Sequence, residues 1–146
     1  MGFNRNPYSV YQKTAVTTAS QGQLIVMLYD GAEKELSAAE NCFEGDGKIP
    51  AKKIESFGKH ILKTQDIINE LQVSLDMEKG GQIAQNLMSL YVYFNRELMS
   101  VNIEQNKEKL LSLLSMIKEL GSAWKTAAVH TDLAPQKAQQ TLNITG

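Results

Sequence analysis

Few side chains in this sequence have the types and spacing that catalysis needs. His60 precedes Asp66 in a segment with helical spacing, and a lone histidine in a helix is more often structural than catalytic. His130 lies in the polar tail. Glu44 and Asp46 stand in a glycine-containing stretch, but the ligand spacing of a calcium loop is absent, which favours a plain turn. The sequence therefore indicates no catalytic site.

Metal and cofactor motifs are also missing. Cys42 is the single cysteine, which excludes an internal disulfide framework and a cysteine-based zinc site and favours a buried thiol. Neither HExxH nor the Glu-x-x-His pairs of di-metal bundles occur. Gly80 and Gly81 follow no strand and precede no Lys-Ser/Thr pair, so they predict a turn and not a phosphate loop. We expect no metal and no cofactor.

Composition excludes further classes of protein. The 146 residues correspond to about one domain, and 42% hydrophobic residues suffice for one core. A net charge of −1 argues against nucleic-acid binding by phosphate neutralisation. No apolar run approaches the ~20 residues of a membrane span, and the amino terminus lacks the apolar run of a signal peptide. We expect a cytoplasmic protein without membrane insertion.

Apolar residues recur at steps of three and four in four segments, the spacing of one helical face. The first helix is expected from a Ser20 cap to about Cys42, the second from Pro50 in its first turn to the Gly80-Gly81 break, the third over 82–101 and the fourth from an Asn106 cap to about Val129. Four helices of similar length with short connections predict an all-α, antiparallel up-down-up-down four-helix bundle. The predicted organisation is an arm over 1–19, the bundle over 20–129 and a flexible polar tail over 130–146.

The four helices together contain more apolar residues than one core can take. The runs over 24–29 and 90–94 pass all the way round a helix, and the stripe over 110–117 is unusually broad. Leu62 beside Ile61 and Ile67 beside Ile68 add a second stripe to the second helix. Three covers for this surplus remain open, namely the amino-terminal arm, a second copy of the chain in a homodimer, and the amphipathic helices of another partner.

Several motifs together resemble one family. They are Asn-Pro-Tyr-x-x-Tyr over 6–11, Met-Leu-Tyr-Asp-Gly-Ala over 27–32, Gln-Asp-Ile-Ile-Asn-Glu-Leu over 65–71, Ser-Leu-Asp-Met-Glu-Lys-Gly-Gly over 74–81 and Ile-Ala-Gln-Asn-Leu over 83–87. With Trp124 in the last helix, they make residues 6–128 resemble the flagellar secretion chaperone FliS family. The chain departs from many relatives at Gln21, where those relatives have proline.

The resemblance implies a non-enzymatic export chaperone. Such proteins bind the disordered carboxyl-terminal segment of flagellin in the cytoplasm, prevent its premature polymerisation and aid its delivery to the gate of the flagellar type III export apparatus. The resemblance also implies that Tyr8 and Tyr11 cover part of the binding surface when flagellin is absent. A self-associating structural bundle without a flagellin partner and an enzymatic or metal-binding bundle are the alternatives.

The candidate residues for the binding surface are apolar residues of the first three helices. For each of them, core packing and groove contact remain open: Leu24, Leu28, Ile67, Ile68, Leu71, Leu75, Leu87, Tyr91 and Phe94. Four polar residues are candidates for partner contacts or for caps: Asp30, Asn69, Asp76 and Asn86.

Overall fold

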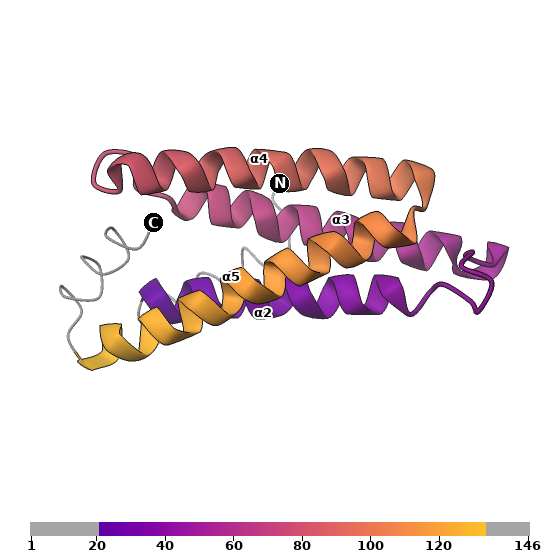
Figure 1. Ribbon diagram of the computed structural model, residues 1–146, viewed down its shortest axis with the longest axis horizontal. Coiled ribbons are helices and arrows are strands. Elements are labelled where there is room, and N and C mark those ends of the chain that lie inside the picture. Colours follow the sequence, from indigo (N-terminus) through magenta and orange to yellow (C-terminus); the bar gives the residue numbers. More distant parts are fainter. Residues whose placement is uncertain (1–20, 134–146) are drawn as a thin grey trace, which may run out of the picture.

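The structure, a computed structural model, describes residues 21–133, with side chains through Val129. Over that range it contains four helices and no strand, which confirms the expected all-α bundle. The helices are α2 (Gln21–Glu40), α3 (Ala51–Ser74), α4 (Gly81–Glu104) and α5 (Lys107–Leu133). Short connections make consecutive helices antiparallel (Figure 1).

The four helices are not equally spaced. Helix α2 packs extensively on both α3 and α5, α3 also packs on α4, and the α4–α5 contact is the smallest. Figure 1 shows α5 starting beside the carboxyl end of α4 and then crossing α2 obliquely, away from α4. Helix α2 has α3 on one side and α5 on the other. Four residues of its apolar run over 24–29 are therefore buried: Leu24, Ile25, Leu28 and Tyr29.

The helix ends show where the apolar pattern is informative and where it is not. The Asn106 cap is confirmed, since its Oδ1 accepts a hydrogen bond from the Lys109 N–H at 3.0 Å. Helix α4 continues past the expected end at Val101 to Glu104 and stops because Gln105 is left-handed, with φ 54°. Helix α5 likewise continues past Val129 to Leu133. Pro50 is the N-cap residue of α3, just before the first turn in which it was expected.

The core is almost entirely apolar. Apart from the hydroxyls of the buried Tyr29 and Tyr91, the polar side chain in the described core is that of Thr64 in α3, whose hydroxyl donates to the His60 carbonyl oxygen at 2.9 Å. That local bond satisfies the buried hydroxyl without a partner from another helix. The bundle is therefore held by side-chain packing, and its functional features have to be sought on its surface.

Candidate functional site

The chemistry-bearing side chains have structural roles. His60 Nδ1 lies 2.8 Å from Glu35 Oε1 on α2, so the histidine joins α3 to α2 and not to Asp66. Cys42 is buried, as expected, with its thiol 3.6 Å from the Ala38 carbonyl oxygen. Residues 21–133 contain no group of three or more histidine, cysteine, aspartate or glutamate residues placed to hold a metal ion. The functional features of this part of the chain are surfaces.

The structure places most of the candidate apolar residues in the core. Seven of them have exposed fractions of 0 or 1%: Leu24, Leu28, Ile67, Ile68, Leu71, Tyr91 and Phe94. Leu75 and Leu87 are half-buried and pack against that core. The two candidate cover residues, Tyr8 and Tyr11, lie outside the described residues. Seven of the nine candidates therefore belong to the core and do not form part of the exposed surface.

The four polar candidates all have partners within the chain. Asp76 Oδ1 accepts hydrogen bonds from the backbone N–H groups of Glu78 and Lys79 and so fixes the turn before α4. The other three are engaged in side-chain pairs between or within helices: Asp30 with Lys125 at 3.5 Å, Asn86 with Gln82 at 2.9 Å and Asn69 with Asn95 at 2.9 Å.

A tyrosine pair crosses the core diagonally. The hydroxyls of Tyr29 on α2 and Tyr91 on α4 lie 2.7 Å apart, and both side chains are buried. Burial raises the pKa of Tyr29 to about 12 and raises the pKa of Tyr91 as well, so both are neutral near pH 7. Trp124 of α5 stacks on the Tyr29 ring at 6.5 Å. Three helices are thereby tied together at one level of the bundle.

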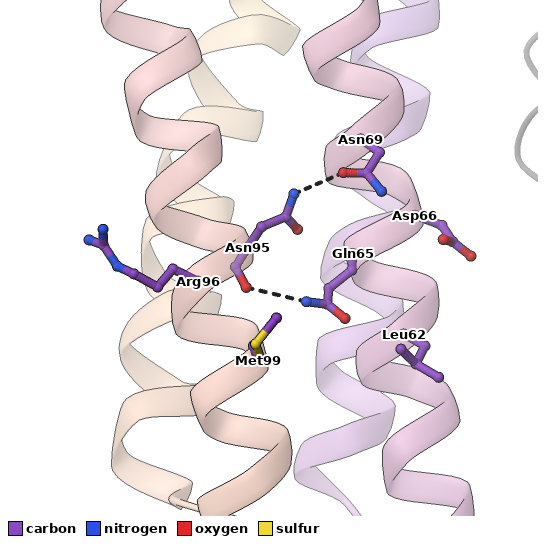
Figure 2. Close-up of a pocket in the computed structure, with 7 residues that line it drawn as sticks. All are labelled: Leu62, Gln65, Asp66, Asn69, Asn95, Arg96 and Met99. Atoms are coloured by element: carbon purple, nitrogen blue, oxygen red, sulfur yellow. Dashed lines mark hydrogen bonds between the residues drawn. The ribbon is translucent and has the colours of Figure 1, made fainter.

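A hollow lies on the surface between α3 and α4. It is open, encloses about 430 Å³ and is lined by Leu62, Gln65, Asp66, Asn69, Asn95, Arg96 and Met99. Figure 2 shows Asn95 facing Asn69 and Gln65 across it, with Leu62 and Met99 at one end. The groove is therefore apolar at one end and carries amides at the other.

Side-chain bonds across this groove set the register of α3 against α4. Gln65 Nε2 donates to the Asn95 carbonyl oxygen at 3.2 Å, and Asn95 Nδ2 donates to Asn69 Oδ1 at 2.9 Å. Further along, Gln72 Nε2 lies 3.5 Å from Met88 Sδ. In this antiparallel register Leu62 is level with Met99, and Asp66 is level with Arg96.

One buried amide atom in the groove lacks a partner. Asn95 Oδ1 has no hydrogen bond although it is shielded from solvent. Exchanging the amide oxygen and nitrogen would leave the nitrogen unpaired instead.

Exposed apolar side chains extend the groove in both directions. They are Leu62 and Val73 on α3 and Val92, Met99 and Ile103 on α4, with exposed fractions between 50 and 77%. Their spacing puts them on the outward side of the two helices, on either side of the groove. We call the groove together with these five residues the α3–α4 face.

A strip of apolar side chains lies along the region where α5 moves away from α4. Its residues are half-buried and pack against the core: Leu90 and Tyr93 on α4, and Met116, Leu120 and Trp124 on α5. We call these five residues the α4–α5 strip. Because α5 crosses toward α2 (Figure 1), α4 does not cover this strip as fully as α3 covers α2.

The sequence matches the family described as flagellar protein FliS over residues 4–131. This chain belongs to the FliS family. It is 38% identical over 114 residues to the flagellar secretion chaperone FliS of Salmonella typhimurium, covering 77% of this chain and 80% of that protein. It is 30% identical over 123 residues to the flagellar secretion chaperone FliS of Bacillus subtilis, covering 84% and 86%.

Family membership places the chain among the chaperones of flagellum biogenesis, which agrees with the resemblance in its motifs. The name of the family points to a role without catalysis. Among the described helices, none is long and apolar enough to cross a membrane.

Sequence reasoning found part of the α3–α4 face and missed the rest. Leu62 and Val92 stood out as surplus apolar residues. Met99, Asn95 and Arg96 did not, because their importance depends on the register between two helices, which the period of each helix alone does not contain.

Proposed function

We propose that this FliS family member is a cytoplasmic, non-enzymatic export chaperone for flagellin. It binds the disordered carboxyl-terminal segment of flagellin, prevents premature polymerisation and aids delivery to the gate of the flagellar type III export apparatus. The observation that carries the proposal is the family match over residues 4–131, on a bundle with apolar side chains that its own described helices leave uncovered.

The energetics of such a complex require a long apolar surface. Folding a disordered segment on binding buries about 1,000–3,000 Å² and loses roughly 2–5 kcal/mol to ordering. Helix α4 has 24 residues and α5 has 27, so the two are about 36 and 40 Å long. We assign the guest to the α4–α5 strip, where large apolar side chains of both helices are half-exposed in the described chain.

Calorimetry with a carboxyl-terminal flagellin peptide tests the proposal. The wild-type chain should bind it, and a peptide of the same composition in scrambled order should not bind. No heat of binding at tens of micromolar would count against the chaperone function.

Two variants of α5 test the assignment to the strip. Met116→Glu places a charge among the apolar residues of the strip and should weaken binding at least tenfold, because a buried unpaired carboxylate is costly. Leu111→Glu is the matched control, since Leu111 is exposed on another side of the same helix and its replacement should leave affinity unchanged. Circular dichroism should show that both variants remain folded.

The proposed cover is tested with the same peptide. If Tyr8 and Tyr11 only compete with the guest for the strip, replacing both by alanine should tighten binding, because the guest no longer has to displace them. Weaker binding of this variant would instead mean that the two tyrosines contact flagellin themselves.

A further inference from the structure

Helix α5 approaches α2 closely at a glycine. A Cβ atom added to Gly121 would lie 3.3 Å from the Cβ of Tyr29 and 3.8 Å from two carbons of its ring. A separation of 3.3 Å is tighter than nearly all contacts that real Cβ atoms make. Any side chain at position 121 would therefore require either Tyr29 or the whole of α5 to move.

Tyr29 is held in place and cannot give way. Its side chain is 1% exposed, its hydroxyl lies 2.7 Å from that of Tyr91, and its ring stacks on Trp124 at 6.5 Å. The atom that a side chain at position 121 would meet first is the Tyr29 Cβ, whose position is fixed by the backbone of α2 and does not change with the rotamer. The contact is thus relieved only if α5 moves away from α2.

The edge of α5 that contains Gly121 carries a large residue first and small residues after it. Leu114, Gly121 and Ala128 are seven residues apart, so they share one edge of the helix. Leu114 and Ala128 are both buried. Helix axes pack about 8–10 Å apart, depending on the side chains at the contact. The decrease in side-chain size along this edge therefore accounts for the oblique path of α5 toward α2 (Figure 1).

The same contact sets the geometry of the α4–α5 strip. Leu120 directly precedes Gly121, and Trp124 follows it by three residues, so both move with α5 wherever Gly121 is held. Leu90 and Tyr93, the α4 part of the strip, belong to a helix whose contact with α5 is the smallest in the bundle. The separation between the two parts of the strip therefore depends on how closely α5 packs on α2.

We propose that Gly121 is a positioning residue for the binding of flagellin. By allowing α5 to pack directly on α2, it keeps the α5 part of the strip at the distance from α4 that an amphipathic guest helix requires. The inference rests on the proposed function, because it concerns the guest that we assign to this strip. Gly121 acts through the position of Leu120 and Trp124 and does not itself have to contact the guest.

Two substitutions of Gly121 test the proposal by calorimetry with the carboxyl-terminal flagellin peptide. Gly121→Leu should increase the separation of the α2 and α5 axes by about 1–2 Å, the range that side-chain size produces in helix packing. We expect it to weaken peptide binding about tenfold or more, because one guest helix can no longer contact both parts of the strip. Gly121→Ala requires a smaller movement and should weaken binding about threefold.

Two matched variants control for the substitutions themselves. Ser122→Leu introduces the same side chain at the next position of α5, which is exposed. Gly58→Ala replaces a glycine within α3, where the new Cβ meets only Asn102 Oδ1 at 3.6 Å. Both variants should bind the peptide as the wild type does.

Two further measurements separate positioning from a purely structural role. Gly121→Ala should change affinity more than stability in urea denaturation, because the higher helix propensity of alanine offsets the strained contact. A purely structural role would lower the urea midpoint and leave the dissociation constant of the folded chain unchanged. In the guest-free chain, Gly121→Leu should also shift the emission of Trp124, since its stacking on Tyr29 loosens, whereas Ser122→Leu should not.

Three results would each overturn the inference: Gly121 variants that bind within twofold of the wild type, a Ser122→Leu variant that loses as much affinity, or an affinity loss no larger than the unfolded fraction explains. If Gly121→Leu does not fold by circular dichroism, Gly121→Ala decides. A wild-type chain that does not bind the peptide overturns the proposed function and this inference with it. A wild type that binds, together with Gly121 variants that bind equally well, overturns this inference alone.

Discussion

Replacing either tyrosine of the diagonal pair by phenylalanine tests whether the hydroxyl bond across the core stabilises the bundle. Tyr29 and Tyr91 are each 1% exposed, and their hydroxyls lie 2.7 Å apart. Removing one hydroxyl leaves the other inside an apolar core, away from water. The decrease in the free energy of unfolding is then mainly the cost of burying the remaining hydroxyl without a partner. The net contribution of the hydrogen bond itself is the smaller part.

The structure indicates the size of each effect. Tyr29→Phe leaves the buried Tyr91 hydroxyl without a hydrogen-bond partner, which should lower the free energy of unfolding by about 1–3 kcal/mol. Tyr91→Phe leaves the Tyr29 hydroxyl without its partner and should cost a similar amount. The double variant removes both hydroxyls and leaves two rings of nearly unchanged shape. It should lose less than the two single variants together, with a coupling energy of about 1–2 kcal/mol.

Urea denaturation of the four proteins, followed by circular dichroism at pH 7, measures this cycle. Equal slopes in the transitions would show that only stability has changed. Additive losses, or single variants within about 0.3 kcal/mol of the wild type, would refute the reasoning.

The same pair predicts how stability depends on alkaline pH. The folded-state pKa of Tyr29 is raised from 10.0 to about 12, and that of Tyr91 is raised too. The unfolded chain therefore loses these protons first, so the free energy of unfolding contributed by the pair is intact below pH 10 and falls as the pH rises from 10 toward 12. The double phenylalanine variant should show a shallower fall over this range, and an unchanged slope would contradict the assignment.

Two further variants test local features of the helices. Asn106→Ala removes the side-chain acceptor at the start of α5 and should lower the free energy of unfolding by about 0.5–2 kcal/mol, whereas Asn106→Asp should retain most of it; a thermal melt compares the two. Gly58→Ala should raise stability by about 0.5–1 kcal/mol in urea denaturation, because α3 gains helix propensity and the new Cβ meets only Asn102 Oδ1 at an ordinary 3.6 Å. A loss of stability in Gly58→Ala would mean that the α3–α4 seam cannot take one more methyl group.

The sequence allowed the helices to be predicted because each carries its own apolar period. The cap at Asn106 could be predicted because a cap forms between neighbours along the chain. The burial of Cys42 could be predicted because no basic residue near it in sequence indicates a reactive thiol. The end of α4 could not, because the apolar stripe stops at Val101 while the helix ends at a left-handed Gln105. A stripe reports which residues face the core, and backbone conformation decides where the turn begins.

The surface was harder to predict than the fold. The surplus of apolar residues was visible in the sequence, but much of it is absorbed because α2 has helices on two sides and Ile67 is as buried as Ile68. What stays exposed is set by the oblique path of α5 and by the register of α3 against α4. Both are relations between helices, and neither the Tyr29–Tyr91 bond nor the Asn69–Asn95 pair has a signature within one segment.

The position of Trp124 gives this protein a built-in optical reporter. It is the only tryptophan in the chain, and it sits on Tyr29 where α5 meets α2, with its indole half-buried in the α4–α5 strip. Helix α3 lies diagonally across the bundle from α5. Binding of a ligand beside α5 should shift the emission wavelength of Trp124, whereas binding to the α3–α4 face should leave the spectrum unchanged. Tryptophan fluorescence can thus distinguish the two binding events without an added label.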